Sequence, residues 1–343
     1  MKTNMLTDNW KITSKYHKVN LSELSFLITG GAGFIGSNIV QYLLDNGAKL
    51  VRVLDDLSNG YEKNIASFID DSRLEFIKGD ITNQETCLEV VKGIDFVSHQ
   101  AALGSVPRSL RTPLLTHEAN STGFLNLLTA AKDSGVKTFV YASSSSVYGD
   151  NIEMPKFEDK TGNPLSPYAV SKKTNELYAK TFNSAFGMQT IGLRYFNIFG
   201  PNQSPNGPYA AVIPLYMNAL LQNKAGKFFG DGEQSRDFTF VENAVQANIK
   251  AMLCENKQAF GEAYNIACGY KTSVKELYGV LKNAAESDKE AEIHPPRMGD
   301  IRDSLASIEK AKVNFGYQPE IGIKEGLEIT LKWFKKEFHP ALD

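Results

Sequence analysis

The stretch "FLITGGAGFIGSNIVQYLLDNG" (26–47) joins three local patterns that together determine the fold. An apolar run comes first, glycines at three-residue spacing follow, and apolar residues at helical spacing continue until Gly47. The glycines are Gly30, Gly33 and Gly36. A strand, a glycine turn and a helix N-terminus in this order suit a pyrophosphate, because backbone amides of the turn and the helix point toward it. Three glycines alone are a weak signal, so the flanking strand and helix carry the interpretation.

The same alternation of short apolar runs and amphipathic stretches continues to about residue 200. Strands are predicted at 26–29, 50–55, 74–79, 95–101, 138–143 and 190–197. Helices are predicted at 34–46, 84–92, 112–134 and 167–186, and a glycine stands where each should end. Apolar strands alternating with helices predict an α/β fold with a Rossmann-type, doubly wound parallel sheet covered on both faces.

The pattern changes after residue 200, where "GPNQSPNGPYA" (200–210) is rich in turn-forming residues. We predict one more strand at 264–267, which returns to the main sheet, and a helix-rich segment from residue 270. The expected domains are a nucleotide-binding domain over 1–200, rejoined by 238–268, and a smaller C-terminal substrate-binding domain over 201–237 and 269–343.

The overall composition argues against several classes of partner. The chain has 343 residues and a formal net charge of −2, which disfavours nucleic acid and a polybasic membrane contact. No apolar run approaches the roughly 18–20 residues of a membrane span, and the first 24 residues lack the apolar centre of a secretory signal. Three isolated cysteines and five scattered histidines predict no metal site and a cytoplasmic protein with reduced thiols.

Asp55 distinguishes between the two nicotinamide dinucleotides. It ends the predicted second strand, 19 residues after Gly36, where a carboxylate can accept hydrogen bonds from a ribose diol and would repel a 2′-phosphate. This favours NAD over NADP. Asp80 follows the third predicted strand, and the sequence leaves open whether it faces the adenine or forms a turn or helix N-cap.

A tyrosine and a lysine in "SPYAVSK" (166–172) form the candidate catalytic pair. On a helix Tyr168 and Lys172 share a face, and an ammonium group beside a phenol stabilises the phenolate. Lowering the tyrosine pKa from about 10 to about 7 requires roughly 4 kcal/mol, which we expect Lys172 and a cationic nicotinamide ring to supply together. Such a pair occurs by chance on many helices, but the serines of "SSSSVYG" (143–149) upstream can hold or relay a substrate proton.

Nine motifs, taken in order, resemble the extended short-chain dehydrogenase/reductase family, and within it the UDP-hexose 4-epimerases. They are "TGGAGFIG", "LDDLSNG", "GDI", "HQAALGSVPRS", "SSSSVYG", "SPYAVSK", "LRYFNIFGP", "GDGEQSRDFTFV" and "RMGDIRDS". The match extends from about residue 26 to residue 335. The segment "AALGSVPRS" and the N-terminal extension look most like the UDP-N-acetylglucosamine 4-epimerases.

The resemblance implies a role for each matching residue. The catalytic residues would be Ser144, Tyr168 and Lys172. The cofactor site would comprise Gly30, Gly33, Phe34, Ile35, Gly36, Asp55, Asn59, Gly60, Asp80, Ile81, Gln100, Ala101, Ala102, Asn120, Tyr168 and Lys172. The UDP-sugar site would comprise Ser105, Ser144, Tyr168, Asn197, Ala211, Val212, Arg236, Arg297, Asp300 and Ser304.

Two of these assignments also agree with the chemistry of the side chains. The guanidinium groups of Arg236 and Arg297 suit a pyrophosphate clamp, although surface ion pairs would explain them equally well. Ser304 stands where some family members carry a tyrosine that excludes N-acetyl groups, so a serine would leave room for an acetamido group. The segment "SLASIEKAK" after it looks helical, and Ser304 could also be the N-cap of that helix.

The implied reaction is NAD-dependent inversion of C4 in a UDP-N-acetylhexosamine, UDP-GlcNAc to UDP-GalNAc, through a transient 4-keto sugar. Activity on UDP-Glc and UDP-Gal stays open, as does the alternative of a UDP-N-acetylglucosaminuronate 4-epimerase. Another NDP-sugar oxidoreductase or a dehydratase is disfavoured, because Ser145 and Ser146 stand where the dehydratases carry an Asp-Glu pair. A nucleotide sensor without activity would not need the serine, tyrosine and lysine together. The resemblance further suggests a homodimer formed through the helices at 112–134 and 167–186.

Overall fold

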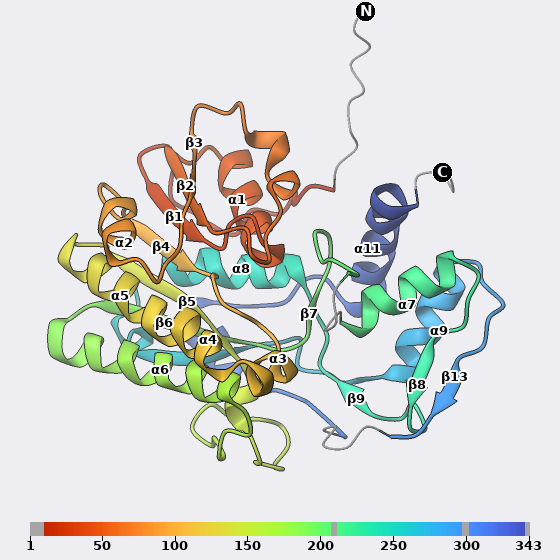
Figure 1. The fold of residues 1–343 in the computed structure, drawn as a ribbon. Coiled ribbons are helices and arrows are strands. Elements are labelled where there is room, and N and C mark those ends of the chain that lie inside the picture. Colours follow the sequence, from red (N-terminus) through yellow and green to blue (C-terminus); the bar gives the residue numbers. More distant parts are fainter. Residues whose placement is uncertain (1–9, 207–210, 297–301, 340–343) are drawn as a thin grey trace, which may run out of the picture.

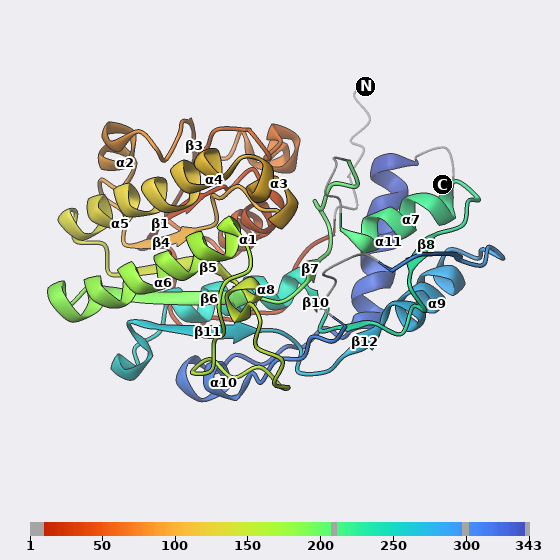
Figure 2. The same cartoon turned by 60° about the horizontal axis from the view of Figure 1, so that its bottom comes forward.

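The computed structural model describes residues 10–206, 211–296 and 302–339, which form two lobes of unequal size (Figure 1). The larger lobe contains the central sheet and the helices on its two faces. The smaller lobe lies beside the carboxyl ends of the strands (Figure 2). Segments of the second half of the chain contribute to both lobes.

Seven parallel strands form the central sheet in the order β3-β2-β1-β4-β5-β6-β11. Their bounds are β1 (Ser25–Thr29), β2 (Leu50–Asp55), β3 (Leu74–Lys78), β4 (Phe96–His99), β5 (Thr138–Ser144), β6 (Gln189–Tyr195) and β11 (Glu262–Ile266). The strand order reverses between β1 and β4, and such a switch point leaves a crevice at the carboxyl edge of the sheet. The predicted Rossmann-type α/β class is confirmed.

Helices cover both faces of this sheet, as buried apolar strands require. One face packs against α1 (Phe34–Asp45), α8 (Val241–Met252) and residues of the N-terminal strap 10–24. The other face packs against α2 (Gln84–Val90), α5 (Gly123–Asp133) and α6 (Pro167–Phe186). At the β11 edge, α10 (Glu309–Phe315) adds the ring of Phe315 to that of Tyr264, with their centres 5.0 Å apart.

The helix predicted over 112–134 is interrupted. After the short α3 (Val106–Arg111), α4 (Pro113–His117) runs into a π-helical turn, η3 (Glu118–Thr122), before α5 begins. Apolar periodicity does not encode such a turn, and π-turns are frequent at functional sites. Two residues of this turn, Glu118 and Ala119, line the cleft at the carboxyl edge of the sheet.

The smaller lobe has its own aromatic core, which includes Tyr216, Phe240 and Phe334. Its helices are α7 (Val212–Leu221), α9 (Val274–Ala284) and α11 (Ile323–Phe338). Its short strands pair as β8 (Lys227–Phe229) with β13 (Glu292–His294) and β9 (Ser235–Arg236) with β12 (Thr272–Ser273), while β7 (Ile198–Phe199) pairs with β10 (Thr239–Phe240) where the lobes meet. Short 3₁₀ turns complete the chain: η1 (Glu62–Asn64), η2 (Ala66–Phe68), η4 (Ser145–Tyr148) and η5 (Lys257–Ala259).

The three cysteines, Cys87, Cys254 and Cys268, are free thiols. Burial raises the pKa of Cys87 and of Cys268 to about 12, so neither offers a thiolate nucleophile near neutral pH. Across the described ranges, no helix combines the length and the apolar character that crossing a membrane requires.

Candidate active site

Close packing at the glycine turn excludes side chains from two of its three glycines. At Gly30, where φ is +66°, an added Cβ would lie 2.7 Å from the backbone nitrogen of Ala101. At Gly36 an added Cβ would lie 2.1 Å from the carbonyl oxygen of Gly30. Gly33 is the N-cap of α1 and donates its N–H to the same carbonyl at 3.0 Å. The amide groups at this helix N-terminus therefore face the crevice without obstruction, as a phosphate site needs.

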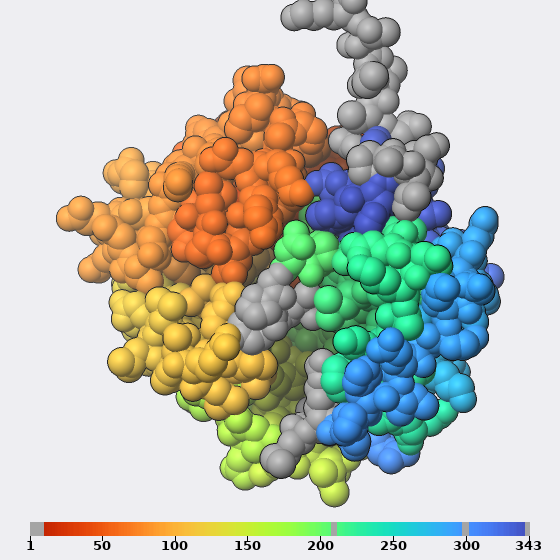
Figure 3. Space-filling model, turned by 45° about the vertical axis from the view of Figure 1, so that its right-hand side comes forward, coloured from red at the N-terminus to blue at the C-terminus, as the bar shows by residue number. Residues whose placement is uncertain are grey.

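A cleft of about 730 Å³ lies above this turn, at the carboxyl edge of the sheet. The molecular surface is hollowed where the two lobes meet (Figure 3). Most of the sequence-predicted residues line the cleft: Gly30, Gly33, Phe34, Ile35, Gly36, Asp55, Asn59, Gly60, Asp80, Ile81, Gln100, Ala101, Ala102, Ser144, Tyr168, Lys172 and Asn197. One continuous cavity thus joins the glycine turn to the tyrosine and lysine.

Asp55 ends β2 inside the cleft, with its carboxylate held by two backbone amides. It accepts hydrogen bonds from the N–H groups of Ala32 and Leu57, both at 2.9 Å. Burial raises the pKa of Asp55, and these hydrogen bonds oppose that shift. Gly60 packs against the carboxylate, because an added Cβ there would lie 2.9 Å from both oxygens. The carboxylate is therefore fixed in place where a ribose diol would be received.

Asp80 also lines the cleft, where it forms a turn. Its carboxylate accepts the N–H of Thr82 at 2.8 Å, whereas the N-cap of α2 is Asn83, which accepts the N–H of Thr86 at 2.9 Å. Of the roles that the sequence left open for Asp80, the turn is therefore observed, and the helix N-cap belongs to Asn83.

The elements that carry the catalytic candidates begin and end at this cleft. Helix α6 starts at Pro167, and its N-cap Ser166 accepts the N–H of Ala169 at 3.1 Å. The first turn of α6 thus places Tyr168 in the same cleft lining as Ser144, the last residue of β5, whose side chain lowers the pKa of Tyr168. One turn later, Lys172 donates to the carbonyl of Ala142 at 2.8 Å, with its Nζ 5.8 Å from the centre of the Tyr168 ring.

Burial acts on the two titratable groups in opposite directions. It raises the pKa of Tyr168, and the side chain of Ser144 only partly opposes this. It lowers the pKa of Lys172 to about 8, because desolvation disfavours the charged form of either group. The expected fall in the pKa of Tyr168 is therefore not produced by the residues of this chain alone.

Two buried hydrogen-bond networks support the wall of the cleft. Tyr195 donates its hydroxyl to Gln100 at 3.1 Å and accepts from Asn248 at 2.7 Å. Ser98 donates to Asn248 at 3.0 Å, so the tip of β4, β6 and α8 are joined. Asn120 also supports the wall. Its side chain accepts the N–H of Leu103 at 2.7 Å and donates to the C=O of Leu103 at 3.2 Å. Asn120 itself is not a lining residue of the cleft.

The predicted substrate residues are less closely gathered. Asn197 lines the cleft with a positive φ of +40°. Arg236 donates to the carbonyls of Ser235 and Arg302 at 2.9 and 3.2 Å, and Ser304 donates its N–H to Ser235 at 3.1 Å. Arg236 and Ser304 therefore lie on one bridge between β9 and the 302–304 segment, outside the lining of the cleft.

The remaining predicted substrate residues are not among the lining residues of the cleft or lie beyond the described ranges. Ser105 caps α3 with a φ of +107°, and Ala211 and Val212 begin α7. Arg297 and Asp300 lie outside the described residues. The N-cap interpretation of Ser304 is wrong, because the next helix, α10, begins at Glu309 with Ile308 as its N-cap.

Comparison with known proteins agrees with this geometry. Residues 26–267 match the sequence model of the NAD dependent epimerase/dehydratase family. The chain belongs to this family. The predicted family and its cofactor, NAD, are thereby confirmed. The residues present fit that cofactor, since the glycine turn leaves a side-chain-free cradle and Asp55 stands at the end of β2.

Relatives within the family differ in the sugar that they act on. The chain is 36% identical over 313 residues to a UDP-glucose 4-epimerase from Mycolicibacterium smegmatis, covering 91% of this chain and 98% of the relative. It is 33% identical to a UDP-glucuronate 4-epimerase from Thermodesulfobacterium geofontis, covering 91% and 96%. A solved UDP-N-acetylglucosamine 4-epimerase from Methanobrevibacter ruminantium M1, in complex with UDP-N-acetylmuramic acid, superposes with a TM-score of 0.87 at 37% identity, covering 92% and 99%.

Sequence reasoning missed several lining residues, including Tyr195 and Glu118. Tyr195 lies near the carboxyl end of the strand predicted at 190–197, and the rule that ligands bind at the carboxyl ends of parallel strands could have found it. Glu118 reaches the cleft through the π-turn, for which the sequence gives no comparable signal.

Proposed function

We propose that this chain is an NAD-dependent UDP-sugar 4-epimerase that prefers UDP-N-acetylhexosamines and interconverts UDP-GlcNAc and UDP-GalNAc. The observation that carries the proposal is the convergence of Ser144, Tyr168 and Lys172 in the cleft of the glycine turn. The similarity to a UDP-N-acetylglucosamine 4-epimerase supports the choice of sugar. Ser145 also lines the cleft where a dehydratase would carry an acid, so elimination of water lacks its proton donor.

In this proposal the side chains of the cleft remove and return the proton of the sugar hydroxyl. Tyr168 takes the proton from O4 and later returns it, while Ser144 holds the same oxygen by a hydrogen bond. Lys172, anchored on Ala142, keeps positive charge beside the phenol ring. NAD in the cleft supplies the acceptor and donor of the C4 hydride and is restored in each turnover. The 4-keto sugar must turn between the two transfers, so that C4 receives the hydride on its other face.

The sugar itself would lie between the lobes. Asn197 and Arg236, together with Arg297 and Asp300, would hold the UDP moiety, and Ser304 would leave space for the acetamido group at C2. Asn197 is the member of this set that lines the cleft. A UDP-N-acetylglucosaminuronate 4-epimerase is the second candidate, favoured by the similarity to a UDP-glucuronate 4-epimerase.

The test is to incubate the purified protein separately with UDP-GlcNAc, UDP-Glc and UDP-GlcNAcA and to follow the anomeric signals by NMR. We expect UDP-GlcNAc to give UDP-GalNAc with the highest kcat/KM and without net formation of NADH. Faster turnover of UDP-GlcNAcA would support the second candidate instead. A 4-keto-6-deoxy product, or no C4 epimer from any of the three, would contradict epimerase activity.

We further propose that the enzyme is a cytoplasmic homodimer. Large apolar side chains are exposed along α3, α4 and α6, which pack against one another: Leu110, Leu114, Leu115, Val170 and Leu177. A contiguous apolar surface on packed helices is typical of an interface between subunits.

A further inference from the structure

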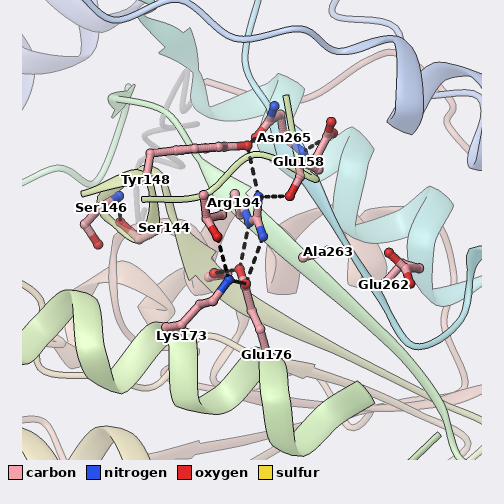
Figure 4. Close-up of polar contacts among 12 residues, drawn as sticks. Ser144, Ser146, Tyr148, Glu158, Lys173, Glu176, Arg194, Glu262, Ala263 and Asn265 are labelled. Atoms are coloured by element: carbon pink, nitrogen blue, oxygen red, sulfur yellow. Dashed lines mark hydrogen bonds and ion pairs between the residues drawn. The ribbon is translucent and has the colours of Figure 1, made fainter. Parts of the chain in front are cut away.

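A buried ion pair stands directly behind the catalytic candidates. Glu176 of α6 and Arg194 of β6 meet in a two-pronged contact, with Nε–Oε1 at 2.8 Å and Nη2–Oε2 at 2.9 Å (Figure 4). Their side chains are 8% and 4% exposed. Bidentate geometry of this kind is the strongest form of an arginine–carboxylate contact, yet a buried pair is weak evidence for stability as such, because desolvation of both charges offsets the attraction.

The pair reaches the catalytic serine through its neighbour in the chain. Ser143 donates its hydroxyl to Glu176 Oε1 at 2.6 Å, and the side chain of Ser144, the next residue, acts on Tyr168 by lowering its pKa. On the other side, Arg194 Nη1 donates to the hydroxyl of Tyr148 at 3.0 Å. The ion pair is therefore hydrogen-bonded both to the tip of β5 and to the η4 turn that follows it.

The same pair also fixes the helix that carries Tyr168 and Lys172. Tyr168, Lys172 and Glu176 follow one another at four-residue spacing and share one face of α6. Ser143 and Arg194 are opposite each other in the β5–β6 register. One contact thus sets the distance between the strand tip that presents Ser144 and the helix face that presents Tyr168. Proton transfer depends on such distances to within about 0.5 Å.

The pair also has an electrostatic consequence. Eight residues of helix separate the Cα atoms of Tyr168 and Glu176 by about 12 Å along the axis. At that distance and an effective dielectric constant of about 20, one uncompensated charge shifts a pKa by roughly one unit. Arg194 and Glu176 compensate each other, so the tyrosine senses little net charge from this side.

The other charged and titratable groups around the pair and the cleft come from several elements. They are Lys172 and Lys173 on α6, Tyr141 on β5, Tyr195 on β6, Tyr148 on η4, His99 on β4, Glu118 on η3, Glu158 before α6, Glu262 on β11 with its partner Lys310, and Asp55, Asp56 and Asp80 of the cleft lining. His99 stays neutral, because burial lowers its pKa to about 3. Lys173 lies 4.0 Å from Glu176 and donates to Thr161 at 2.9 Å. All of these groups are unchanged in the variants that follow.

We propose that Glu176 and Arg194 are positioning residues for the epimerase reaction: together they hold Ser144 against Tyr168 and present no net charge to them. This inference rests on the proposed function. It predicts opposite responses when either charge is removed alone, because each substitution leaves the other charge behind the tyrosine.

The decisive experiment is the pH profile of kcat for the single and double variants. Glu176→Gln leaves the guanidinium, which favours the phenolate, so the acid limb of the profile should move down by up to about one pH unit. Arg194→Gln leaves the carboxylate, so the acid limb should move up by a similar amount. Combining the two substitutions should return the limb to the wild-type position. In all three variants we expect kcat to fall at least tenfold while KM changes less than threefold.

Two further variants separate positioning from charge and from general stability. Ser143→Ala keeps both charges but removes the link to β5, so kcat should fall with an unshifted pH profile. Glu75→Gln breaks an ion pair of similar length, Arg52–Glu75 at 2.7 Å, between β2 and β3 away from the catalytic candidates, and should leave both kcat and the profile unchanged.

The outcomes separate this inference from the function on which it rests. A wild-type protein that epimerises no UDP-sugar contradicts the proposed function. An active wild type with single-charge variants that fold, as judged by their thermal midpoints, but shift in the same direction or not at all contradicts the inference. If those variants do not fold, Ser143→Ala decides: unchanged kcat in that variant also overturns it.

Discussion

Burial shifts the pKa of Tyr168 and the pKa of Lys172 in opposite directions. These two shifts determine which charges the chain itself brings to the reaction. Desolvation raises the pKa of the phenol and lowers that of the ammonium group to about 8. Only the side chain of Ser144 opposes the first effect. A tyrosine base near neutral pH therefore needs a positive charge in addition to Lys172, and an oxidised nicotinamide ring carries one. In this proposal the base becomes effective only in the loaded cleft.

Replacing Tyr168 with Phe removes the ionisable oxygen and little else. We expect kcat to fall at least ~10²-fold, the usual scale for a general base, while UDP-sugar affinity is retained. Steady-state kinetics and calorimetric titration with UDP measure the two quantities. Tyr178→Phe, on the exposed side of the same helix, is the control. Near-normal turnover of the Tyr168→Phe variant would contradict the assignment.

We propose that cofactor choice depends on Asp55, whose carboxylate two backbone amides hold in place. The Asp55→Asn substitution removes the charge that would repel a 2′-phosphate. We expect weaker retention of NAD and measurable binding of NADP, determined by analysis of the nucleotide bound to the purified protein. Asp71→Asn, before β3 and outside the lining of the cleft, serves as control. Asp55 is misassigned if the wild type carries NADP or the variant retains NAD unchanged.

Ser304 lies in the segment bridged to β9 and caps no helix, so its replacement breaks no helix cap. Ser304→Tyr should lower kcat/KM for UDP-GlcNAc and UDP-GalNAc by steric exclusion and spare UDP-Glc and UDP-Gal. Ser304→Ala, which keeps the space, should behave as the wild type. Equal losses on all four sugars would place the wall of the sugar pocket elsewhere.

Among the elements, those with strong local signals were predictable. The strands of the sheet and helix α6 appear where apolar runs, helical periodicity and terminal glycines place them, because these signals depend on neighbours in the sequence. The π-turn at 118–122 was not predictable, since its register change follows from packing. The nucleotide half of the cleft could be predicted from one motif. The substrate half could not be assembled in the same way, because β9 and the 302–304 segment meet only through tertiary contacts.

Asp237, which follows β9, connects two other segments from the second half of the chain. Its carboxylate accepts the N–H groups of Cys268, Gly269 and Ala306 at 2.8, 3.0 and 3.4 Å. Burial raises its pKa to about 6 from a usual value of 3.8, although these hydrogen bonds oppose the shift. The folded protein therefore binds this proton more tightly than the unfolded chain. Stability from this group is complete below about pH 4 and is lost as the pH rises through 6.

The expected consequence is a pH-dependent free energy of unfolding. Between pH 4.5 and pH 7 the contribution of Asp237 should fall by roughly 2 kcal/mol. Asp237→Asn has no proton to exchange, so its unfolding free energy should be lower overall but less dependent on pH in this interval. Urea denaturation of both proteins at pH 4.5 and pH 7 measures the difference. Parallel behaviour of the two proteins would show that Asp237 does not titrate as described.

At the scale of the whole molecule, the helices α3, α4 and α6 expose apolar side chains that no other part of the described chain covers. Leu114 on α4 is 84% exposed and Leu177 on α6 is 59% exposed. The helices α4 and α6, which carry these residues, are in contact with each other. Single exposed leucines are ordinary on a monomer, whereas several on packed helices favour a partner.

Lysine at these positions should therefore separate the subunits of the proposed homodimer. We expect the wild type to be a dimer by sedimentation velocity at micromolar concentration, and Leu114→Lys combined with Leu177→Lys to be a monomer, because each buried lysine would leave a charge uncompensated at the interface. Val313→Lys changes a valine that is 78% exposed on α10, at the β11 edge of the sheet, and should leave the dimer intact. Since the cleft lies within one chain, the monomeric variant should keep bound NAD. A monomeric wild type, or a dimeric double variant, would place the interface elsewhere or exclude it.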